Sequence, residues 1–416
     1  MREWRKGEPQ ARKTHTYILL IHPNLLQVRN MNGNMGRPPL ISDIVLVGGG
    51  HAHVHALKMF GMPPLKNILQ ENGIQVTLIS SSSLTPYSGM LPGFIAGHYT
   101  RDDIHLDLRK LCSFSGIRFI HAAANGITYK EGGGGSVSCS DGRPDVRYDV
   151  ISIDVGSSPS MPSSLLNADS SVFNETSDQN VTPVKPIASF SDRWEGICNK
   201  VQKISLENLN ETPKFRLLVV GGGAGGIELA LSAQYALQRI VQHRLDMDHV
   251  GAADCEEVSK SVIKVTLATR GNNLLPSHNE SVRTIFERIL KERNIDVYMG
   301  ADAVGVEYIG GEKTLKLSPE SKPLDKPILF DECLWCTSAG VSSWLELSTP
   351  FDTVNGGFLS VGDTYESTSH PGVFAAGDCC HMFSNPRPKA GVFAVRAGEC
   401  IYVGVIFCLD GVSHRN

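Results

Sequence analysis

The chain has 416 residues, of which 41% are hydrophobic and 20% charged, and its formal net charge is −4. This length can hold two domains of ordinary size, each with its own core. The weakly acidic balance gives no electrostatic reason to expect nucleic acid or an anionic membrane as a partner. Ten cysteines are too few for a disulfide scaffold in so long a chain, so a reducing compartment is the default expectation.

The first forty residues are basic, with seven Lys or Arg against two Glu. An Arg-rich, acid-poor start is typical of organelle presequences, but Glu3 and a weak helical periodicity fit a disordered tail equally well. We therefore expect residues 1–42 to be a disordered or targeting extension. The expected location is intracellular and cytoplasmic by default, with a mitochondrion or plastid as the alternative.

A strand–glycine–helix pattern opens the fold at Asp43–Leu57, DIVLVGGGHAHVHAL. After an apolar strand at Ile44–Val47, Gly48 and Gly50 take the first two positions of a G-x-G-x-x-G pattern. Such a turn lets the backbone approach a diphosphate, and the unpaired N–H groups at the helix start bind anions. His53 takes the third glycine position, where we expect it to pack or cap the first helix.

A second strand is expected at Gln75–Ser80. An acidic residue usually ends this strand and holds a ribose, but here Ser80 and Ser81 stand in its place and become the candidate ribose partners. The stretch Thr85–Tyr99, TPYSGMLPGFIAGHY, has too many Gly and Pro for a regular element. It is either a loop that lies against a flat ring system or an ordinary hydrophobic connection.

Further strands are expected at Arg118–His121 and at Asp149–Ser157, DVISIDVGS. The Gly-Ser end of the latter brings Gly156 and Ser157 into the set of cofactor candidates. Residues 158–180 are polar and should run over the surface, before a helix at Ser191–Leu209.

The second glycine pattern lies at Phe215–Ser232, FRLLVVGGGAGGIELALS. Here Gly221, Gly223 and Gly226 complete G-x-G-x-x-G after an apolar strand. A helix should follow through Gln242, with Glu228 near its start.

The next strand, Val262–Thr269, follows a polar insert at Asp246–Ser261 and ends at Arg270. An arginine there can pair with a 2′-phosphate and favours NADPH over NADH, although a solvated surface arginine fits nearly as well. A helix at Glu280–Asn294 and a strand at Leu334–Gly340 close this unit.

Two cysteine pairs are candidates for redox or metal sites. Cys333 and Cys336 have C-x-x-C spacing, but on a buried strand they point to opposite faces, and no second such pair completes a metal site. Cys379 and Cys380 are expected to pack at a helix start. The structural interpretation is favoured for all the cysteines.

The late stretch Ser369–Asp378, SHPGVFAAGD, is expected to deliver Asp378 from a strand to a corner followed by a helix start. There the carboxylate can accept hydrogen bonds from sugar hydroxyls. A helix is expected at Val392–Cys400. The apolar run Cys400–Leu409 falls short of the roughly eighteen residues that span a bilayer, so the protein should be soluble or at most peripheral.

Together these stretches resemble the flavin-dependent pyridine nucleotide oxidoreductases with two dinucleotide-binding domains. GGGHAH is similar to the FAD loop, GGGAGGIE to the NAD(P) loop, and HPGVFAAGD to the late FAD motif whose aspartate touches the ribityl chain. More narrowly, DIVLVGGGHAHVHALKMFG and TPYSGMLPGFIAGHY resemble the type II NADH dehydrogenase-like flavoprotein fused ahead of selenide, water dikinase. No kinase half is recognised, so selenium chemistry is not carried over.

The resemblance implies an α/β fold with two Rossmann-like dinucleotide-binding domains, the NAD(P) domain inserted in the FAD domain. After the extension at 1–42, the FAD domain would occupy 43–200 and 341–400, the NAD(P) domain 201–340, and an atypical tail 401–416. FAD would be held by Gly48, Gly50, Ser80, Ser81, Gly156, Ser157 and Asp378. NADH or NADPH would be held by Gly221, Gly223, Gly226, Glu228 and Arg270.

The implied activity is hydride transfer from nicotinamide to FAD, and then electron transfer to a small-molecule or small-carrier acceptor. No catalytic acid–base residue and no metal is demanded, because the cofactors carry the chemistry. Ala52–Phe60 lacks the Cys pair of disulfide reductases, and Ala394–Gly398 lacks the glutamines of quinone-reducing members. The alternative is a non-catalytic or truncated nucleotide-binding regulatory protein. The oligomeric state is left open.

Overall fold

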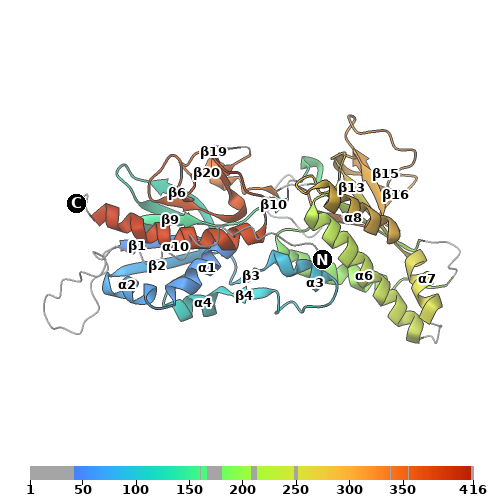
Figure 1. The fold of residues 1–416 in the computed structure, drawn as a ribbon, viewed down its shortest axis with the longest axis horizontal. Coiled ribbons are helices and arrows are strands. Elements are labelled where there is room, and N and C mark those ends of the chain that lie inside the picture. Colours follow the sequence, from blue (N-terminus) through green and yellow to red (C-terminus); the bar gives the residue numbers. More distant parts are fainter. Residues whose placement is uncertain are drawn as a thin grey trace, which may run out of the picture.

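The computed structural model describes residues 42–159, 161–165, 180–207, 213–247, 252–337, 339–354 and 356–413. Nearly all of the extension expected at 1–42 and most of the surface excursion expected at 158–180 lie outside these residues. The described chain forms two lobes side by side along the long axis of the molecule (Figure 1).

A five-stranded parallel sheet with the order β21-β9-β1-β2-β5 forms the centre of the first lobe. Ile44 of β1 lies opposite Val76 of β2 and Val150 of β9. The last four residues of β1 are buried, as expected for a central parallel strand covered on both faces. The strands are β1 (Ser42–Val47), β2 (Ile74–Ser80), β5 (Arg118–His121), β9 (Val150–Ile153) and β21 (Val373–Ala375).

A second five-stranded parallel sheet, with the order β11-β17-β12-β13-β14, forms the other lobe. Its central strand β12 carries the second glycine turn, as β1 carries the first. The strands are β11 (Val181–Pro183), β12 (Phe215–Val220), β13 (Ile263–Thr269), β14 (Asp296–Met299) and β17 (Glu332–Trp335). The two sheets therefore repeat one Rossmann-like arrangement, which confirms the expected fold class.

The order of the strands along the chain shows an insertion. β21 joins the first sheet only after the chain has formed the whole second sheet. The second sheet also takes β11, which lies within the range 43–200 that was assigned to the first unit. The chain thus enters the second unit upstream of residue 201.

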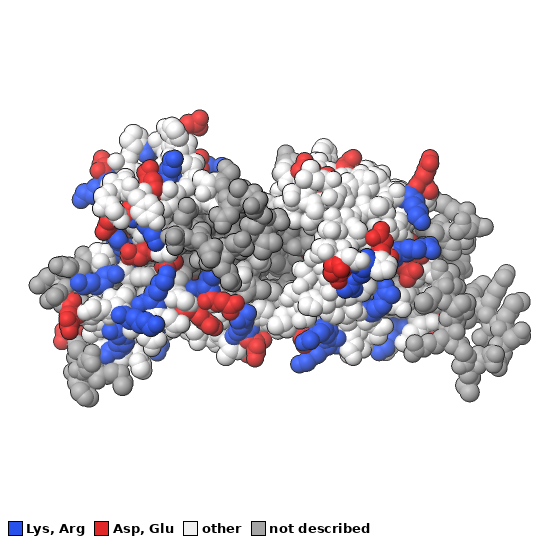
Figure 2. All heavy atoms as spheres, turned by 180° about the vertical axis from the view of Figure 1, so that it is seen from behind, with Lys and Arg blue, Asp and Glu red and all other residues white. Residues whose placement is uncertain are grey.

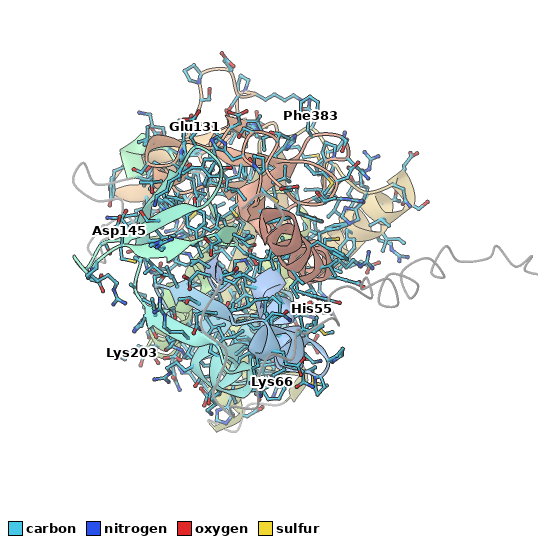
Figure 3. The ribbon with its side chains drawn as sticks, turned by 90° about the vertical axis from the view of Figure 1, so that its left-hand side faces the viewer. His55, Lys66, Glu131, Asp145, Lys203 and Phe383 are labelled. Atoms are coloured by element: carbon cyan, nitrogen blue, oxygen red, sulfur yellow. The ribbon has the colours of Figure 1, made fainter. Side chains whose placement is uncertain are left out.

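Helices and a β-layer cover opposite faces of the first sheet. One face packs on α1 (His51–Phe60), α2 (Leu65–Glu71), α4 (Leu108–Ser115) and α10 (Gly391–Ser413). The other packs on β6 (Ala124–Tyr129), β7 (Gly135–Cys139) and β8 (Val146–Tyr148), and on β19 (Thr353–Val354), β20 (Phe358–Val361) and β22 (Cys380–Met382). Figure 3 shows this end of the molecule, with His55 and Lys66 on the helical side and Glu131 and Asp145 on the β-layer.

Helices α1 and α10 approach closely. A Cβ on Gly398 would lie 2.7 Å from the backbone oxygen of Ala52, so this position admits no side chain without movement. Ala56, Ile401 and Val405 fill the neighbouring core. The contact seats the late helix directly on the helix that follows the first glycine turn.

Helix α10 is longer than the helix expected at Val392–Cys400. It also contains a segment long enough to cross a membrane, which the sequence was not expected to have. By length and composition alone, its segment Gly391–Leu409 is sufficiently long and apolar, although 44% of that segment is buried within the fold. Arg396 and Glu399 interrupt the apolar run in the sequence, but the helix continues through both. Its packing on α1 also fits a core helix, so composition alone is weak evidence for a membrane span.

The second lobe carries its own helices. These are α5 (Ile187–Gln202), α6 (Ala224–Met247), α7 (Ala252–Val262) and α8 (Glu280–Glu292). The expected helix at Ser191–Leu209 starts and ends earlier, and the one after Gly226 runs past Gln242. The insert expected to be polar and irregular contains α7, which buries Cys255, Ser259 and Val262 at helical spacing among exposed charged residues.

The remaining elements lie outside the two parallel sheets and their main helices. They are β3 (Leu84–Pro86), η4 (Ser88–Met90), α3 (Leu91–Ile95), β4 (His105–Asp107), β10 (Ser158–Pro159), η5 (Ser163–Leu165), β15 (Ala303–Ile309), β16 (Glu312–Leu317), β18 (Ala339–Gly340), α9 (Trp344–Leu347) and η6 (Gly377–Cys379). The strand expected at Leu334–Gly340 is thus split into β17 and β18. The stretch Thr85–Tyr99 is more regular than expected, because Pro92 sits in the first turn of α3, where no N–H is required.

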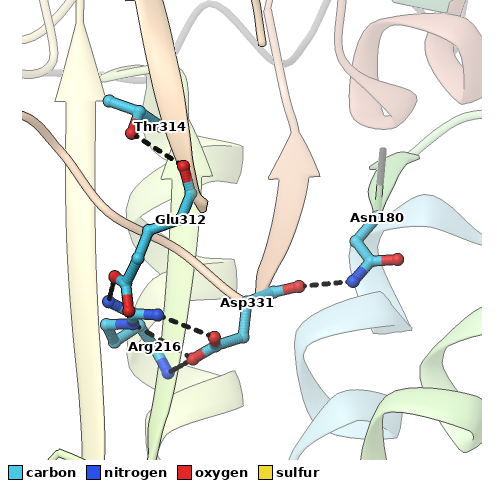
Figure 4. Close-up of polar contacts among 5 residues, drawn as sticks. All are labelled: Asn180, Arg216, Glu312, Thr314 and Asp331. Carbon is cyan, nitrogen blue, oxygen red and sulfur yellow. Dashed lines mark hydrogen bonds and ion pairs between the residues drawn. The ribbon is translucent and has the colours of Figure 1, made fainter. Parts of the chain in front are cut away.

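An ion-pair network ties the amino-terminal edge of the second sheet together (Figure 4). Arg216 of β12 bonds Asp331 at 2.9 Å and Glu312 at 2.5 Å, and these carboxylates raise the pKa of its guanidinium. The side-chain amide of Asn180 donates to the backbone oxygen of Asp331 at 2.8 Å, and Thr314 donates to that of Glu312. The network lies at the end of β12 away from the glycine turn, so we assign it a structural role.

Candidate functional site

The first glycine turn is held against the end of β9. Gly48 has φ +97°, and a Cβ there would lie 2.2 Å from the backbone oxygen of Asp154. A Cβ on Gly50 would lie 2.1 Å from the Asp154 carboxylate. The Gly50 N–H donates to the Asp154 carbonyl at 3.0 Å. A side chain on Gly48 would displace the backbone after β9, and one on Gly50 would displace the Asp154 carboxylate.

A cavity of ≈ 410 Å³ opens at the carboxyl ends of the first sheet, beside this turn. In open α/β sheets ligands bind at this edge. The cavity draws its walls from stretches far apart in the sequence. All seven residues expected to hold FAD lie on it: Gly48, Gly50, Ser80, Ser81, Gly156, Ser157 and Asp378.

A lysine absent from the sequence candidates joins this cavity. Lys185 Nζ lies 2.6 Å from Asp378 Oδ2 and 3.1 Å from Ser157 Oγ, and Ser157 donates to the same carboxylate at 3.0 Å. Lys185 comes shortly after β11 of the second sheet. No pattern around it in the sequence points to a site.

Asp154 occupies part of the start of α1. Its Oδ2 accepts the N–H groups of Ala52 at 2.9 Å and of His53 at 3.3 Å, and the side chain is buried. The expectation that the N–H groups at this helix start are all unpaired is therefore wrong for these two. Burial raises the pKa of Asp154 to about 7, and Asp378 adds to the shift. The only feature of the sequence that could have pointed to this contact is a lone carboxylate, Asp154, inside an apolar strand.

His53 is a structural residue, as expected. It is fully buried, with Nδ1 2.7 Å from the Gly48 carbonyl oxygen and Nε2 2.8 Å from Ser152 Oγ. The ring thereby ties the glycine turn to β9. Burial lowers its pKa to about 4, so the ring is neutral at neutral pH.

His51 is the polar group best placed to meet a ligand. It lines the cavity with its ring 4.9 Å from that of Tyr87, between ring centroids. Its Nε2 is buried and has no hydrogen-bond partner among the described residues. Buried polar atoms are normally paired, so this atom fits a group that a bound cofactor would supply.

The two serines at the end of β2, Ser80 and Ser81, differ in how free their side chains are to bond a ribose. Ser80 Oγ donates to the Ser82 carbonyl at 2.8 Å, which uses its proton within the turn. The Ser81 side chain is exposed, and its carbonyl lies 3.1 Å from His121 Nε2. Ser80 is therefore left as an acceptor only, a weaker ribose partner than the sequence indicated.

No helix start follows the late motif. Asp378 lies within the short η6, which is followed by β22, and α10 begins only at Gly391. Cys379 Sγ donates to the Ala376 carbonyl at 3.2 Å. Burial raises the pKa of both Cys379 and Cys380, so the two thiols pack beneath the corner without becoming thiolates.

The second glycine turn is built differently at each of its glycines. Gly221 has φ +134°, and a Cβ there would lie 2.5 Å from the Cys336 carbonyl oxygen. A Cβ on Gly226 would lie 1.9 Å from the Gly221 carbonyl oxygen, whereas Gly223 has nothing within 4 Å. Packing explains the first and third glycines, while the second borders open space.

The other nicotinamide candidates lie at the same edge. The Gly221 N–H donates to Ala268 of β13 at 2.8 Å, and the Gly222 carbonyl accepts from Leu275 at 2.8 Å. Arg270 directly follows β13, is exposed, and forms no ion pair within the described ranges. Glu228 is exposed near the start of α6. The structure thus brings these candidates to one strand edge.

Charged side chains of both signs are interspersed over both lobes on the face shown in Figure 2. That face carries no extended field of one sign. Steering of a strongly charged macromolecule is therefore not a feature of this side.

Residues 42–398 match the family model described as pyridine nucleotide-disulphide oxidoreductase. The chain is 25% identical over 200 residues to an NADH oxidase of Streptococcus pneumoniae, covering 48% of this chain and 36% of the oxidase. It is 22% identical over 255 residues to a type II NADH:quinone oxidoreductase of Haemophilus influenzae, covering 59% and 53%. The chain spans about half or less of the length of these curated relatives.

Two solved structures illustrate the shared fold. The water-forming NADH oxidase from Lactobacillus brevis bound to NADH has a TM-score of 0.60 at 15% identity, covering 88% of this chain and 70% of that one. The sulfide:quinone oxidoreductase of Aquifex aeolicus has a TM-score of 0.62 at 16% identity, covering 89% and 78%.

Proposed function

Since this chain belongs to the pyridine nucleotide-disulphide oxidoreductase family, we propose that it is an FAD-dependent NAD(P)H oxidoreductase. The observation that carries the proposal is a four-strand order that recurs in two parallel sheets, as β9-β1-β2-β5 and as β17-β12-β13-β14, each with a glycine turn after its central strand. Such turns bind the diphosphate of a dinucleotide. The two glycine turns can therefore bind two dinucleotides.

FAD belongs in the cavity beside the first turn. Asp378, held by Lys185 and Ser157, can accept hydrogen bonds from sugar-chain hydroxyls, and His51 Nε2 is free to bond the cofactor. NADH or NADPH belongs at the second turn, where Gly223 leaves room for a diphosphate. When bound, FAD supplies the chemistry of accepting a hydride from the reduced nicotinamide.

The chain's own contribution is positional. Backbone and side-chain groups hold the two dinucleotides, and proximity supplies most of the acceleration. The neutral His53 and the paired Asp378 are not required to move protons. No catalytic acid–base residue is assigned.

The acceptor is proposed to be a small molecule or small carrier that is not a disulfide. None of the described residues lining the cavity is a cysteine, and α1 carries none. Oxygen and a quinone are the first acceptors to test, because curated relatives include an NADH oxidase and an NADH:quinone oxidoreductase. The closer relation to the flavoprotein fused ahead of selenide, water dikinase remains a proposal, supported by the two motifs that resemble it.

Anaerobic reduction of the purified protein tests the function. We expect a yellow protein whose flavin absorbance bleaches on addition of NADH or NADPH and returns with oxygen or a quinone, but not with an oxidised dithiol. A stable, colourless protein that takes up no added FAD would instead support the regulatory alternative. Return of the flavin absorbance with the oxidised dithiol alone would contradict the proposed acceptor class.

A further inference from the structure

The Asp154 carboxylate lies at the start of α1, the kind of helix start at which dinucleotide-binding folds hold a diphosphate. Two N–H groups at the start of α1 donate to its Oδ2. Its Oδ1 lies between two backbone turns, since a Cβ on Gly50 would lie 2.1 Å from it and a Cβ on Gly377 2.3 Å. The side chain is 1% exposed, so the surrounding backbone enforces this position.

The groups around Asp154 do not neutralise it with a full positive charge. On α1, His53 is neutral, because burial lowers its pKa to about 4, and the pKa of His51 is also lowered. On η6, Asp378 repels it, and burial raises the pKa of Cys379 and of Cys380 on β22, so neither thiol carries a charge that offsets Asp154. The nearby ammonium of Lys185 is bonded to Asp378, and Asp154 forms no ion pair within the described part of the chain.

We propose that Asp154 takes up a proton when FAD binds, and that this residue therefore makes the affinity for FAD depend on pH. The inference rests on the proposed placement of FAD beside the first glycine turn. A negatively charged diphosphate and an ionised carboxylate at one helix start repel each other. A proton from solvent on Oδ1 removes the repulsion, while Oδ2 still accepts from the helix.

The proposed proton uptake by Asp154 falls in a pH range that can be tested experimentally. Burial raises the pKa of Asp154 to about 7. If only the protonated form binds FAD, the Kd rises about tenfold between about pH 6 and about pH 8. An amide at this position is neutral throughout and can still accept through its oxygen.

The test is a titration of flavin-free protein with FAD, followed by quenching of flavin fluorescence across this range. The wild-type Kd should rise about tenfold, whereas Asp154→Asn should bind independently of pH and about tenfold more tightly than wild type near pH 8. Asp149→Asn is the matched control, because Asp149 precedes the same strand and also accepts a backbone N–H, from Asp43 at 2.8 Å. It should behave as wild type.

Two further measurements keep the outcome unambiguous. His51→Gln should keep the wild-type slope, and loss of the slope would assign the proton to His51 and overturn the proposal. Calorimetry of wild-type FAD binding in buffers of different ionisation enthalpy should show uptake of close to one proton near pH 8. This measurement holds even where the Asp154 variant does not fold.

The two proposals fail differently. FAD binding with a flat pH profile and no proton uptake would overturn the role of Asp154 and leave the FAD site standing. A slope that persists in Asp154→Asn would do the same. A folded wild-type protein that binds no FAD at any pH would overturn both.

Discussion

Lys185 Nζ lies 2.6 Å from Asp378 Oδ2, although the two residues belong to chain segments that emerge from different sheets. Lys185 comes after β11 of the second sheet, and Asp378 comes after β21 of the first. The pair lies on the wall of the first cavity, with 32% and 14% of the side chains exposed. A residue delivered by the inserted unit thus neutralises a carboxylate in the proposed FAD site.

Lys185→Met should weaken FAD binding about fivefold, or ~1 kcal/mol, because Asp378 then repels the anionic cofactor without a counter-charge. The measurement is the FAD Kd by fluorescence quenching at neutral pH. Lys110→Met, which removes an exposed lysine of α4, is the matched control. An unchanged Kd in Lys185→Met would show that the ion pair is only structural.

Gly223→Val should abolish NAD(P)H binding while FAD stays bound and the fold is kept. Its Cβ meets no atom within 4 Å, so the valine projects into the space proposed for the diphosphate. Gly226→Val is the contrast, because its Cβ would lie 1.9 Å from the Gly221 carbonyl oxygen and should destabilise the second unit. Thermal unfolding and NADPH titration of both variants separate the two effects. Joint loss of both cofactors in a folded Gly223→Val would argue against separate sites.

Arg270→Glu should shift coenzyme preference from NADPH towards NADH. The arginine ends β13 beside the glycine turn, where a 2′-phosphate can pair with it. We expect kcat/KM for NADPH to fall by at least about tenfold, the scale of one lost charge-assisted hydrogen bond, with little change for NADH. Arg288→Glu, in an exposed pair with Glu292 on α8, controls for net charge. Equal effects on both coenzymes would exclude the phosphate contact.

His53→Gln should change how stability depends on pH. The folded protein lowers the pKa of His53 from 6.5 to about 4, so this histidine's contribution is fully present above 6.5 and is lost as pH falls towards 4. The difference in unfolding free energy between wild type and variant should shrink by about 1.4 kcal/mol per pH unit below that point. Asp154 titrates in both proteins, so its own contribution largely cancels. Urea denaturation at a series of pH values gives the difference, and a constant difference would contradict the buried neutral ring.

Arg216→Leu should lower the free energy of unfolding by about 1–2 kcal/mol, because Asp331 and Glu312 lose their shared partner. Arg216→Lys keeps the charge but not the forked geometry, and should lie between wild type and the leucine variant. FAD and NADPH affinities should not change, since the network is at the far end of β12. A change in cofactor affinity without a change in stability would remove the structural assignment.

Local patterns in the sequence identified much of this fold. The apolar strands and the glycine spacing fall on β1 and β12, and the cofactor candidates lie at the carboxyl edges of the two sheets. Helix α7 was missed because its buried positions alternate with a strongly polar set, and the apolar segment of α10 was judged too short because Arg396 and Glu399 break its apolar run. Both errors arise because the composition of a segment was used to predict its structure, whereas the helical spacing of its apolar residues decides which of them are buried.

What the sequence by itself determined is the pair of strand–glycine–helix units, because strand, turn and helix start are neighbours along the chain and each has its own residue pattern. Only the tertiary structure decided that Asp154 reaches the N–H groups of α1 and that Lys185 reaches Asp378. Those contacts join residues about a hundred or more positions apart, and the parallel packing of the strands decides which ends meet. No local pattern encodes that meeting, so the charges within the proposed FAD site became visible only in the folded chain.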